Sequence, residues 1–366
     1  MNPLRRFARG SLDGAKASRA PECAAIDSMA RRRSGPVTNR RALVAALAVG
    51  LFAARTNSTA QQPQRVWRIG FLVAASRQFY LDSGRLDALR AGLRELGYVE
   101  GKNLVIEARY ADGQYDRLSG FASELVGLKV DLIVAAPSPA IRAAKQATTT
   151  IPIVFPSTGD PVGSGFVASL AHPGGNLTGM SNSNLDVSAK TLELLRTVVP
   201  GMSRVAVLAN PGSSTESAML KSIGAAAQTV GVQIVRVEAR NLEEIETGFA
   251  TMTRERVDAM VIASDALMGM QQRQIADLAV KHQLPSIAQG AAYARNGGLL
   301  GYGLNSLDLY RSAAVYIDKI LKGAKPGDLP VQQPSRLELV INMKTARALG
   351  VTVPQALLVR ADELIQ

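Results

Sequence analysis

The sequence predicts an α/β fold made of two lobes, each a doubly wound parallel β-sheet with helices on both faces. From residue 67 onward, short β-branched apolar segments alternate with amphipathic helical segments, the order of elements in parallel sheets. Several segments are apolar at consecutive positions, such as residues 132–134 and 205–208, as expected where helices cover both sheet faces. The alternation occurs twice, and 366 residues exceed one comfortable core, so two domains are expected.

The first series of elements follows this pattern closely. A helix is expected over residues 84–96, because Leu86, Leu89, Leu93 and Leu96 form one apolar stripe. Short connections between strands and helices imply right-handed crossovers. Strands are expected over residues 68–74, 104–110, 130–135 and 151–155.

The second series follows a segment rich in Gly, Pro and Asn at residues 172–179. It begins at Met202, after a helix expected over residues 189–198. A long helix over residues 307–322 should end at Gly323 in a left-handed C-cap position. Strands are expected over residues 204–209, 233–237, 259–263, 299–301 and 337–341, followed by a short terminal helix. The helix at residues 307–322, the strand at 337–341 and the terminal helix indicate that the chain crosses back between the lobes.

The positive charge is concentrated at the N-terminus. The formal net charge is +12, of which residues 1–60 carry +8, so the rest of the chain has a net charge of only +4. In that remainder the charges alternate in sign along the predicted helices, which is typical of an ordinary solvated surface. A nucleic-acid-binding function therefore loses its main support.

Residues 1–60 have the form of an export signal. A basic region ends at Arg40 and Arg41, a thirteen-residue apolar stretch covers residues 42–54, and Ser58-Thr59-Ala60 offers a cleavage site. The apolar stretch is too short to span a bilayer, which takes about 20 residues. We expect a periplasmic mature protein that begins near Gln61, with a true start possible at Met29. The alternative is a basic tail on a cytosolic protein.

The mature chain is expected to lack cysteine chemistry. Cys23 is the single cysteine and lies within the export signal, so the mature protein has no disulfide and no site for a lipid anchor.

Enzymatic signatures are missing from the sequence. The two histidines, His172 and His282, are expected at the surface, and no pattern of zinc ligands accompanies them. There is no GxSxG nucleophile elbow, and the glycine pairs do not follow the spacings that bind phosphates. We therefore expect no catalytic residues, no metal, no cofactor and no enzymatic activity.

A ligand-binding cleft is better supported. Side chains that follow parallel strands converge at the carboxyl edge of the sheet, where open α/β sheets bind ligands. Ser138 begins a helix and suits a ligand carboxylate, while Asp265 suits an ammonium group. The candidate ligand-binding residues are Ser76, Phe79, Ser138, Thr158, Asp160, Asn210 and Asp265.

Five of these candidates also have a purely structural interpretation. Ser138, Asp160 and Asp265 are all suited to capping a helix without touching a ligand. Asn210 begins an Asn-Pro-Gly turn signature. Phe79 is suited either to stacking on a ligand or to packing on neighbouring helices.

Six segments carry a resemblance to a known family. They are RIGFL at residues 68–72, GYVEGKNL at 97–104, GDPVG at 159–163, PGGNLTG at 173–179, AKPGDLPV at 324–331 and ELVIN at 338–342. Together they resemble the ABC-transporter substrate-binding family that includes tryptophan- and tyrosine-binding proteins of the type I periplasmic binding fold. The resemblance extends over about residues 65–365.

The resemblance implies two doubly wound lobes joined by three crossover strands, with a small-molecule ligand between them. The N-terminal lobe would comprise residues 66–179 plus 304–326, and the C-terminal lobe residues 182–301 plus 334–366. The implied partner is an ABC-transporter permease, with no nucleic acid, and the protein is expected to be a monomer. Arg77, in the loop after the first strand, is not expected in amino-acid-binding relatives and leaves room for a carboxylated ligand.

Two other function classes use related folds. Regulators of the lac-repressor type bind effectors in the same two-lobed fold, but they need an N-terminal helix-turn-helix, and that part of this sequence has no such pattern. An enzyme is the third class, because a doubly wound fold alone does not determine function.

Overall fold

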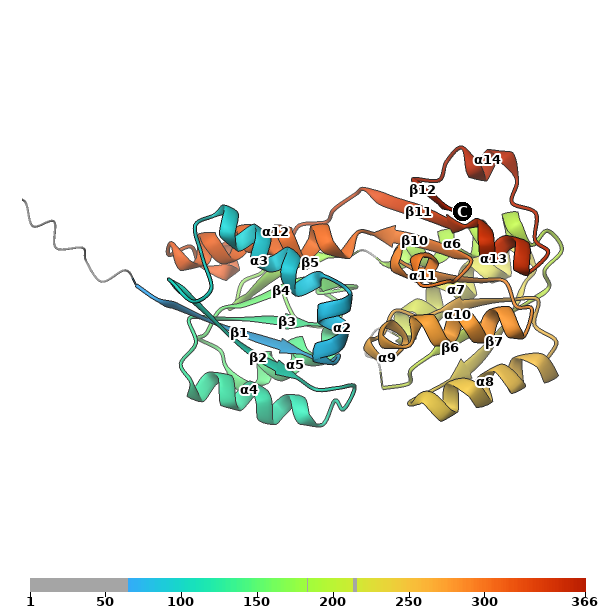
Figure 1. Ribbon diagram of the computed structural model, residues 1–366. Coiled ribbons are helices and arrows are strands. Elements are labelled where there is room, and N and C mark those ends of the chain that lie inside the picture. Colours follow the sequence, from blue (N-terminus) through green and yellow to red (C-terminus); the bar gives the residue numbers. More distant parts are fainter. Residues whose placement is uncertain (1–64, 183, 213–215) are drawn as a thin grey trace, which may run out of the picture. The chain divides into compact units, whose positions relative to one another are not determined.

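A computed structural model describes residues 65–182, 184–212 and 216–366 (Figure 1). The predicted export signal at residues 1–60, with its cleavage site and Met29, lies outside the described residues.

The first sheet has five parallel strands in the order β2-β1-β3-β4-β5. Its central strands are buried throughout their apolar runs, because helices cover both faces. The strands are β1 (Trp67–Val73), β2 (Leu104–Tyr110), β3 (Leu132–Ala136), β4 (Ile153–Thr158) and β5 (Leu177–Ser181).

Five helices accompany this sheet: α2 (Arg77–Asp82), α3 (Arg85–Glu95), α4 (Arg117–Gly127), α5 (Ser138–Ala147) and α12 (Ser306–Leu321). Helix α12 comes from the C-terminal part of the chain but packs against α3 and β4 (Figure 1). The two helices approach closely at Gly92, where a Cβ atom would lie 2.5 Å from the carbonyl oxygen of Arg311. Leu86, Leu89 and Leu93 of the predicted apolar stripe are buried, but Leu96 follows the end of α3 and is 37% exposed.

The second sheet has seven strands in the order β12-β11-β10-β9-β8-β6-β7. Strand β6 shows that both faces are covered: Val205 and Val207 pack into one apolar cluster, and Ala206 and Leu208 pack into another. The strands are β6 (Arg204–Ala209), β7 (Gln233–Glu238), β8 (Ala259–Ile262), β9 (Ser286–Gln289), β10 (Leu300–Leu304), β11 (Leu337–Asn342) and β12 (Glu363–Ile365).

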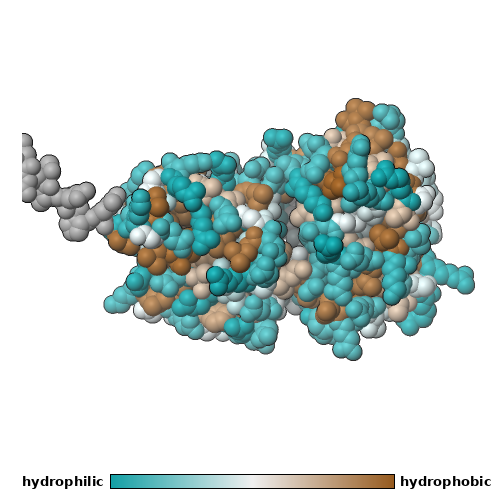
Figure 2. Space-filling model, in the orientation of Figure 1, coloured by the Kyte–Doolittle hydropathy of each residue, from teal (hydrophilic) through white to brown (hydrophobic). Residues whose placement is uncertain are grey.

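The helices that follow β5 and accompany the second sheet are mostly short. They are α6 (Asn184–Val198), α7 (Glu216–Val230), α8 (Leu242–Arg254), α9 (Ala266–Met270), α10 (Gln272–Lys281), α11 (Ala292–Arg295), α13 (Met343–Ala348) and α14 (Gln355–Leu358). Hydrophilic residues cover most of the visible face in Figure 2, as expected for helices whose apolar sides pack on the sheets.

The structure differs from the sequence-based expectation at four strands: β5, β9 and β12 are not predicted, and β11 runs in the opposite direction to its neighbour β10. Strand β5 lies at the end of the segment that reads as a Gly/Pro/Asn-rich separator. It pairs with β4 at Gly179, where a Cβ atom would come within 2.0 Å of the carbonyl oxygen of Phe155. Strands β9 and β12 are only four and three residues long. Strand β11 pairs with β10 in an antiparallel manner, so the second sheet is mixed rather than wholly parallel.

The chain passes between the two sheets three times: from β5 to α6, from β10 to α12, and from the 3-10 helix η1 (Pro326–Asp328) to β11. Gly323, after α12, has a φ of +102°, which matches the predicted glycine C-cap. Backbone hydrogen bonds join two of the connections, from Ser181 N to the Gln332 carbonyl (2.8 Å) and from Gln332 N to the Gly179 carbonyl (3.0 Å).

Candidate ligand pocket

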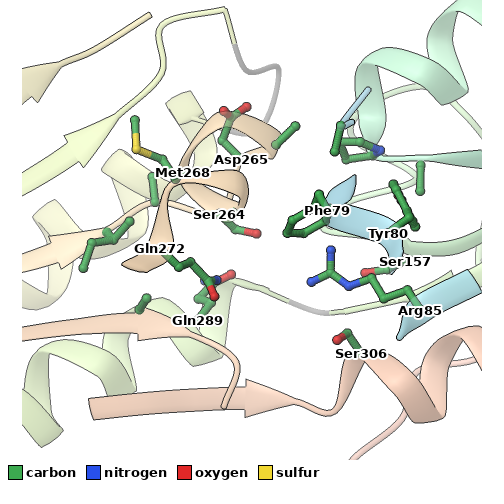
Figure 3. A pocket seen from close by; sticks show the side chains of 18 of the residues that line it. Phe79, Tyr80, Arg85, Ser157, Ser264, Asp265, Met268, Gln272, Gln289 and Ser306 are labelled. Carbon is green, nitrogen blue, oxygen red and sulfur yellow. The ribbon is translucent and has the colours of Figure 1, made fainter. Parts of the chain in front are cut away.

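A pocket of about 150 Å³ lies where strands of both sheets end (Figure 3). Its lining includes residues at or just after the carboxyl ends of β1, β3, β4, β8 and β9: Ala75, Ala136, Ser157, Ala263 and Gln289. The carboxyl ends of parallel strands are where open α/β sheets bind ligands, so the fold itself makes this the candidate site.

Arg85 is the cation of the pocket. It begins α3 directly after Gly84, whose φ of +66° allows the tight entry into the helix. The Arg85 guanidinium carbon lies 4.7 Å from the centre of the Phe79 ring. Its Nε is buried and has no hydrogen-bond partner among the described residues. A charged N–H donor is therefore left without an acceptor beside the pocket.

Two tyrosines lie beside Arg85. Tyr80 on α2 and Tyr310 on α12 both line the pocket, and their hydroxyl oxygens are 2.9 Å apart. Burial, reinforced by the neighbouring Tyr310 hydroxyl, raises the pKa of Tyr80 well above its ordinary value. Burial also raises the pKa of Tyr310. Both hydroxyls are therefore neutral donors and acceptors at physiological pH.

Asp265 is the anion of the pocket. It caps the N-terminus of α9, and its Oδ1 accepts hydrogen bonds from Leu267 N (2.8 Å) and from Asn210 Nδ2 (3.1 Å). Its Oδ2 accepts a hydrogen bond from the Tyr115 hydroxyl, 2.5 Å away. Burial, with the adjacent Asp265 carboxylate, raises the pKa of Tyr115. The carboxylate thus already has three donors from the protein.

The remaining lining is mixed. Gln272 and Gln289 contribute side-chain amides, Ser306 a hydroxyl, and Met268 and Phe79 apolar surface. Phe79 also approaches α9, because a Cβ atom on Gly269 would lie 3.5 Å from the Phe79 ring. The pocket therefore combines one cation, one anion, neutral hydrogen-bonding groups and apolar surface, as small-molecule sites do.

The pocket brings together some of the residues that the sequence singles out. Phe79 and Asp265 line it directly. Asn210 does not line the pocket, but its Nδ2 donates a hydrogen bond to the Asp265 carboxylate and its Oδ1 accepts one from Gly212 N (2.9 Å). Ser76 caps α2 by accepting a hydrogen bond from Phe79 N (3.2 Å).

The lining also leaves out Ser138, Thr158 and Asp160, as it does Asn210 and Ser76. Ser138 and Thr158 are buried next to the lining residues Pro137 and Ser157, and their hydroxyl oxygens are 3.2 Å apart. Asp160 Oδ1 accepts a hydrogen bond from Gly163 N (2.7 Å), which closes a turn after β4.

Sequence reasoning missed Arg85, Tyr310, Gln272, Gln289 and Ser306, all of which line the pocket. Arg85 lies in a predicted amphipathic helix, where a charged residue normally faces solvent. Ser306 and Tyr310 lie on α12, and the Tyr80–Tyr310 contact joins residues 230 positions apart. No local pattern signals such a contact.

The sequence matches the family of ABC transporter substrate binding proteins over residues 83–365. The chain belongs to this family. It is 29% identical over 269 residues to a tyrosine-binding protein of Clostridioides difficile strain R20291, covering 74% of this chain and 77% of the relative. The family assignment made from the six segments is confirmed.

Solved structures of similar proteins extend this result. A conserved domain protein of Vibrio cholerae is 28% identical, with a TM-score of 0.77 over 82% of this chain and 100% of that chain. An ABC domain from Streptococcus pneumoniae in complex with L-Trp is 27% identical, with a TM-score of 0.76 and the same coverage. The leucine-binding protein LivK of Thermotoga maritima, at 13% identity and a TM-score of 0.54, shares the fold. The predicted type I periplasmic binding fold is confirmed.

Among the residues that the structure describes, this substrate-binding protein has no helix long and apolar enough to cross a membrane.

Proposed function

We propose that this substrate-binding protein is the periplasmic receptor of an ABC import system and captures a small carboxylate-bearing or amino-acid-like ligand. The observation that carries the proposal is the pocket at the strand ends of both sheets, which presents Arg85 from one side and Asp265 from the other. A site with one cation, one anion and an apolar wall suits a polar ligand with an apolar side chain. Its role is binding rather than catalysis.

The relatives support an aromatic amino acid as the first ligand to test. One is named for tyrosine, and another was solved with L-Trp. The cavity of about 150 Å³ is on the scale that accommodates a benzene ring. Phe79 and Met268 would contact such a ring, and sulfur and aromatic groups both pack favourably on aromatic ligands.

Export and transfer to a permease complete the proposal. The basic and apolar segments of residues 1–60 support cleavage near Gln61, which would yield a thiol-free, unanchored periplasmic monomer. Intact-mass measurement of the periplasmic protein tests this, and a species that keeps residues 42–54 would contradict cleavage.

Titration calorimetry on the mature protein tests the binding function. The panel is L-tyrosine, L-tryptophan, L-phenylalanine, L-leucine and the corresponding aromatic carboxylic acids. We expect a saturable, one-to-one interaction with at least one aromatic member. If no member of the panel binds, the proposed ligand class is wrong.

A further inference from the structure

The Arg85 guanidinium is an incomplete hydrogen-bonding group. Buried polar groups in folded proteins almost always have partners, so a buried N–H donor without one needs an explanation. No acidic side chain forms an ion pair with Arg85 among the described residues, and its Nε lacks an acceptor. Because Arg85 lines the pocket, an acceptor supplied by the ligand would complete it.

The surroundings of Arg85 favour a carboxylate as that acceptor. A guanidinium is planar and can bind a carboxylate with two parallel hydrogen bonds. The Arg85 guanidinium carbon lies 4.7 Å from the centre of the Phe79 ring, within the range of a cation–π contact, and Phe79 in turn approaches Gly269. Tyr80, Tyr310 and Ser306 add neutral hydroxyls along the same part of the lining. This part of the pocket is therefore built to receive negative charge.

Asp265, the negative charge of the pocket, differs from Arg85 because the protein already supplies its hydrogen-bond partners. Asp265 already accepts hydrogen bonds from Leu267 N, Asn210 Nδ2 and the Tyr115 hydroxyl. A ligand ammonium group would have to share this carboxylate with three protein donors, whereas a ligand carboxylate would meet an unpartnered donor. The two ends of a zwitterionic ligand should thus contribute unequally to affinity.

We infer that Arg85 is the specificity-determining residue of the pocket and that the protein selects its ligand by the carboxylate rather than by the ammonium group. The inference rests on the proposed binding function and narrows it. Deaminated acids should be accepted, and decarboxylated amines should be rejected. The accepted class is then aromatic monocarboxylates, of which the amino acids are one kind.

Calorimetry on the wild-type mature protein tests this with two matched series. One is L-tyrosine, 3-(4-hydroxyphenyl)propionate and tyramine, and the other is L-tryptophan, indole-3-propionate and tryptamine. We expect each acid to bind within about tenfold of its amino acid, and each amine to lose roughly 100-fold or more, as when one partner of a desolvated charge pair is removed.

Arg85→Gln should lower the affinity for the amino acid and for the acid by a similar factor of about 100. Arg85→Lys keeps the positive charge but loses the paired N–H donors of the guanidinium, so its affinity should lie between those of the wild type and Arg85→Gln. Arg77→Gln is the matched control, because the structure places Arg77 at the exposed start of α2 and outside the lining, not in a ligand-facing loop as the sequence suggests. Melting curves check that each variant is folded, and the wild-type ligand series decides the question without any variant.

The outcomes separate the two proposals. If no compound in either series binds the wild-type protein, the proposed ligand class fails and this inference fails with it. If the amino acids bind but the amines bind equally well, or Arg85→Gln folds and binds normally, only the role of Arg85 is overturned.

Discussion

The two charged residues of the pocket differ in how the protein treats them. Asp265 has its carboxylate held by three donors, one of which, Tyr115, precedes α4 of the first sheet while Asp265 itself follows β8 of the second. The Arg85 guanidinium lies over the Phe79 ring, and among the described residues its buried Nε has no hydrogen-bond partner.

This difference distinguishes a structural charge from a binding charge. The Asp265 carboxylate caps α9 and accepts a hydrogen bond from Tyr115 near the first sheet, so it stabilises the folded protein even without a ligand. An unpartnered charged donor costs stability until an acceptor arrives. Arg85 should therefore contribute mainly to affinity, and Asp265 mainly to the folded state.

The largest expected effect is a difference in protein stability between variants of Asp265 and variants of Arg85. Asp265→Ala should lower the free energy of unfolding of the ligand-free protein by about 2–4 kcal/mol, because it removes a helix cap and leaves the Tyr115 hydroxyl and the Asn210 amide without an acceptor. Arg85→Gln should change it by only about 0.5 kcal/mol. Urea denaturation measures both values. Equal losses for the two variants would remove the distinction.

A smaller effect on stability is expected from removing the hydrogen bond between Tyr115 and Asp265, which joins elements of the two sheets. Tyr115→Phe deletes one hydroxyl that donates to a carboxylate, and it should cost about 1–2 kcal/mol of unfolding free energy. Tyr110→Phe is the control, because the Tyr110 hydroxyl makes no hydrogen bond to a described residue. If both variants lose the same stability, the Tyr115–Asp265 hydrogen bond contributes nothing.

The smallest effects are on tyrosine ionisation, and they have opposite signs. Burial and the Asp265 charge raise the pKa of Tyr115, so Asp265→Asn should lower that pKa. Burial raises the pKa of Tyr80 while the Arg85 charge opposes it, so Arg85→Gln should raise the pKa of Tyr80 further. Ultraviolet titration of tyrosinate follows both. Shifts of the same sign would contradict the assignment of the charges.

These raised pKa values also set the direction of the pH dependence of stability. The pKa of a tyrosine in the unfolded chain is about 10. When the pKa in the folded protein is higher, the stability that the neutral hydroxyl contributes is fully present below about pH 10, and it is lost as the pH rises from there through the folded pKa. Tyr80, Tyr115 and Tyr310 should therefore make the protein less stable in strong alkali, with little effect near neutrality.

The fold could be predicted wherever burial leaves a mark on local sequence. The consecutive apolar residues of β3 and β6 predict strands covered on both faces, and the leucine stripe predicts α3. Strand β9 is four residues long and includes Ser286 and Gln289, so nothing local distinguishes it from a turn. Strand β5 contains Gly179, which the close approach of β4 requires but which reads as a loop residue.

The site could be predicted only in part, for a related reason. Asp265 comes three residues after β8 and Phe79 lies on α2, the first helix after β1, so the rule that ligands bind at strand ends finds both. Arg85 lies a helix further along, and Tyr310 comes from a helix that returns to the first sheet after the second sheet is nearly complete. Long-range packing brings these residues together, and pairing across 230 positions leaves no periodic signal.

A crystal structure of the mature protein with L-tyrosine or L-tryptophan bound would show which charged residue of the pocket binds the ligand. Both carboxylate oxygens of the ligand are expected to accept hydrogen bonds of about 2.7–3.0 Å from the Arg85 guanidinium. Asp265 is expected to keep its hydrogen bond from Tyr115. A ligand carboxylate bound elsewhere, with Arg85 turned away and Asp265 released to the ammonium group, would show that Arg85 is not the binding charge.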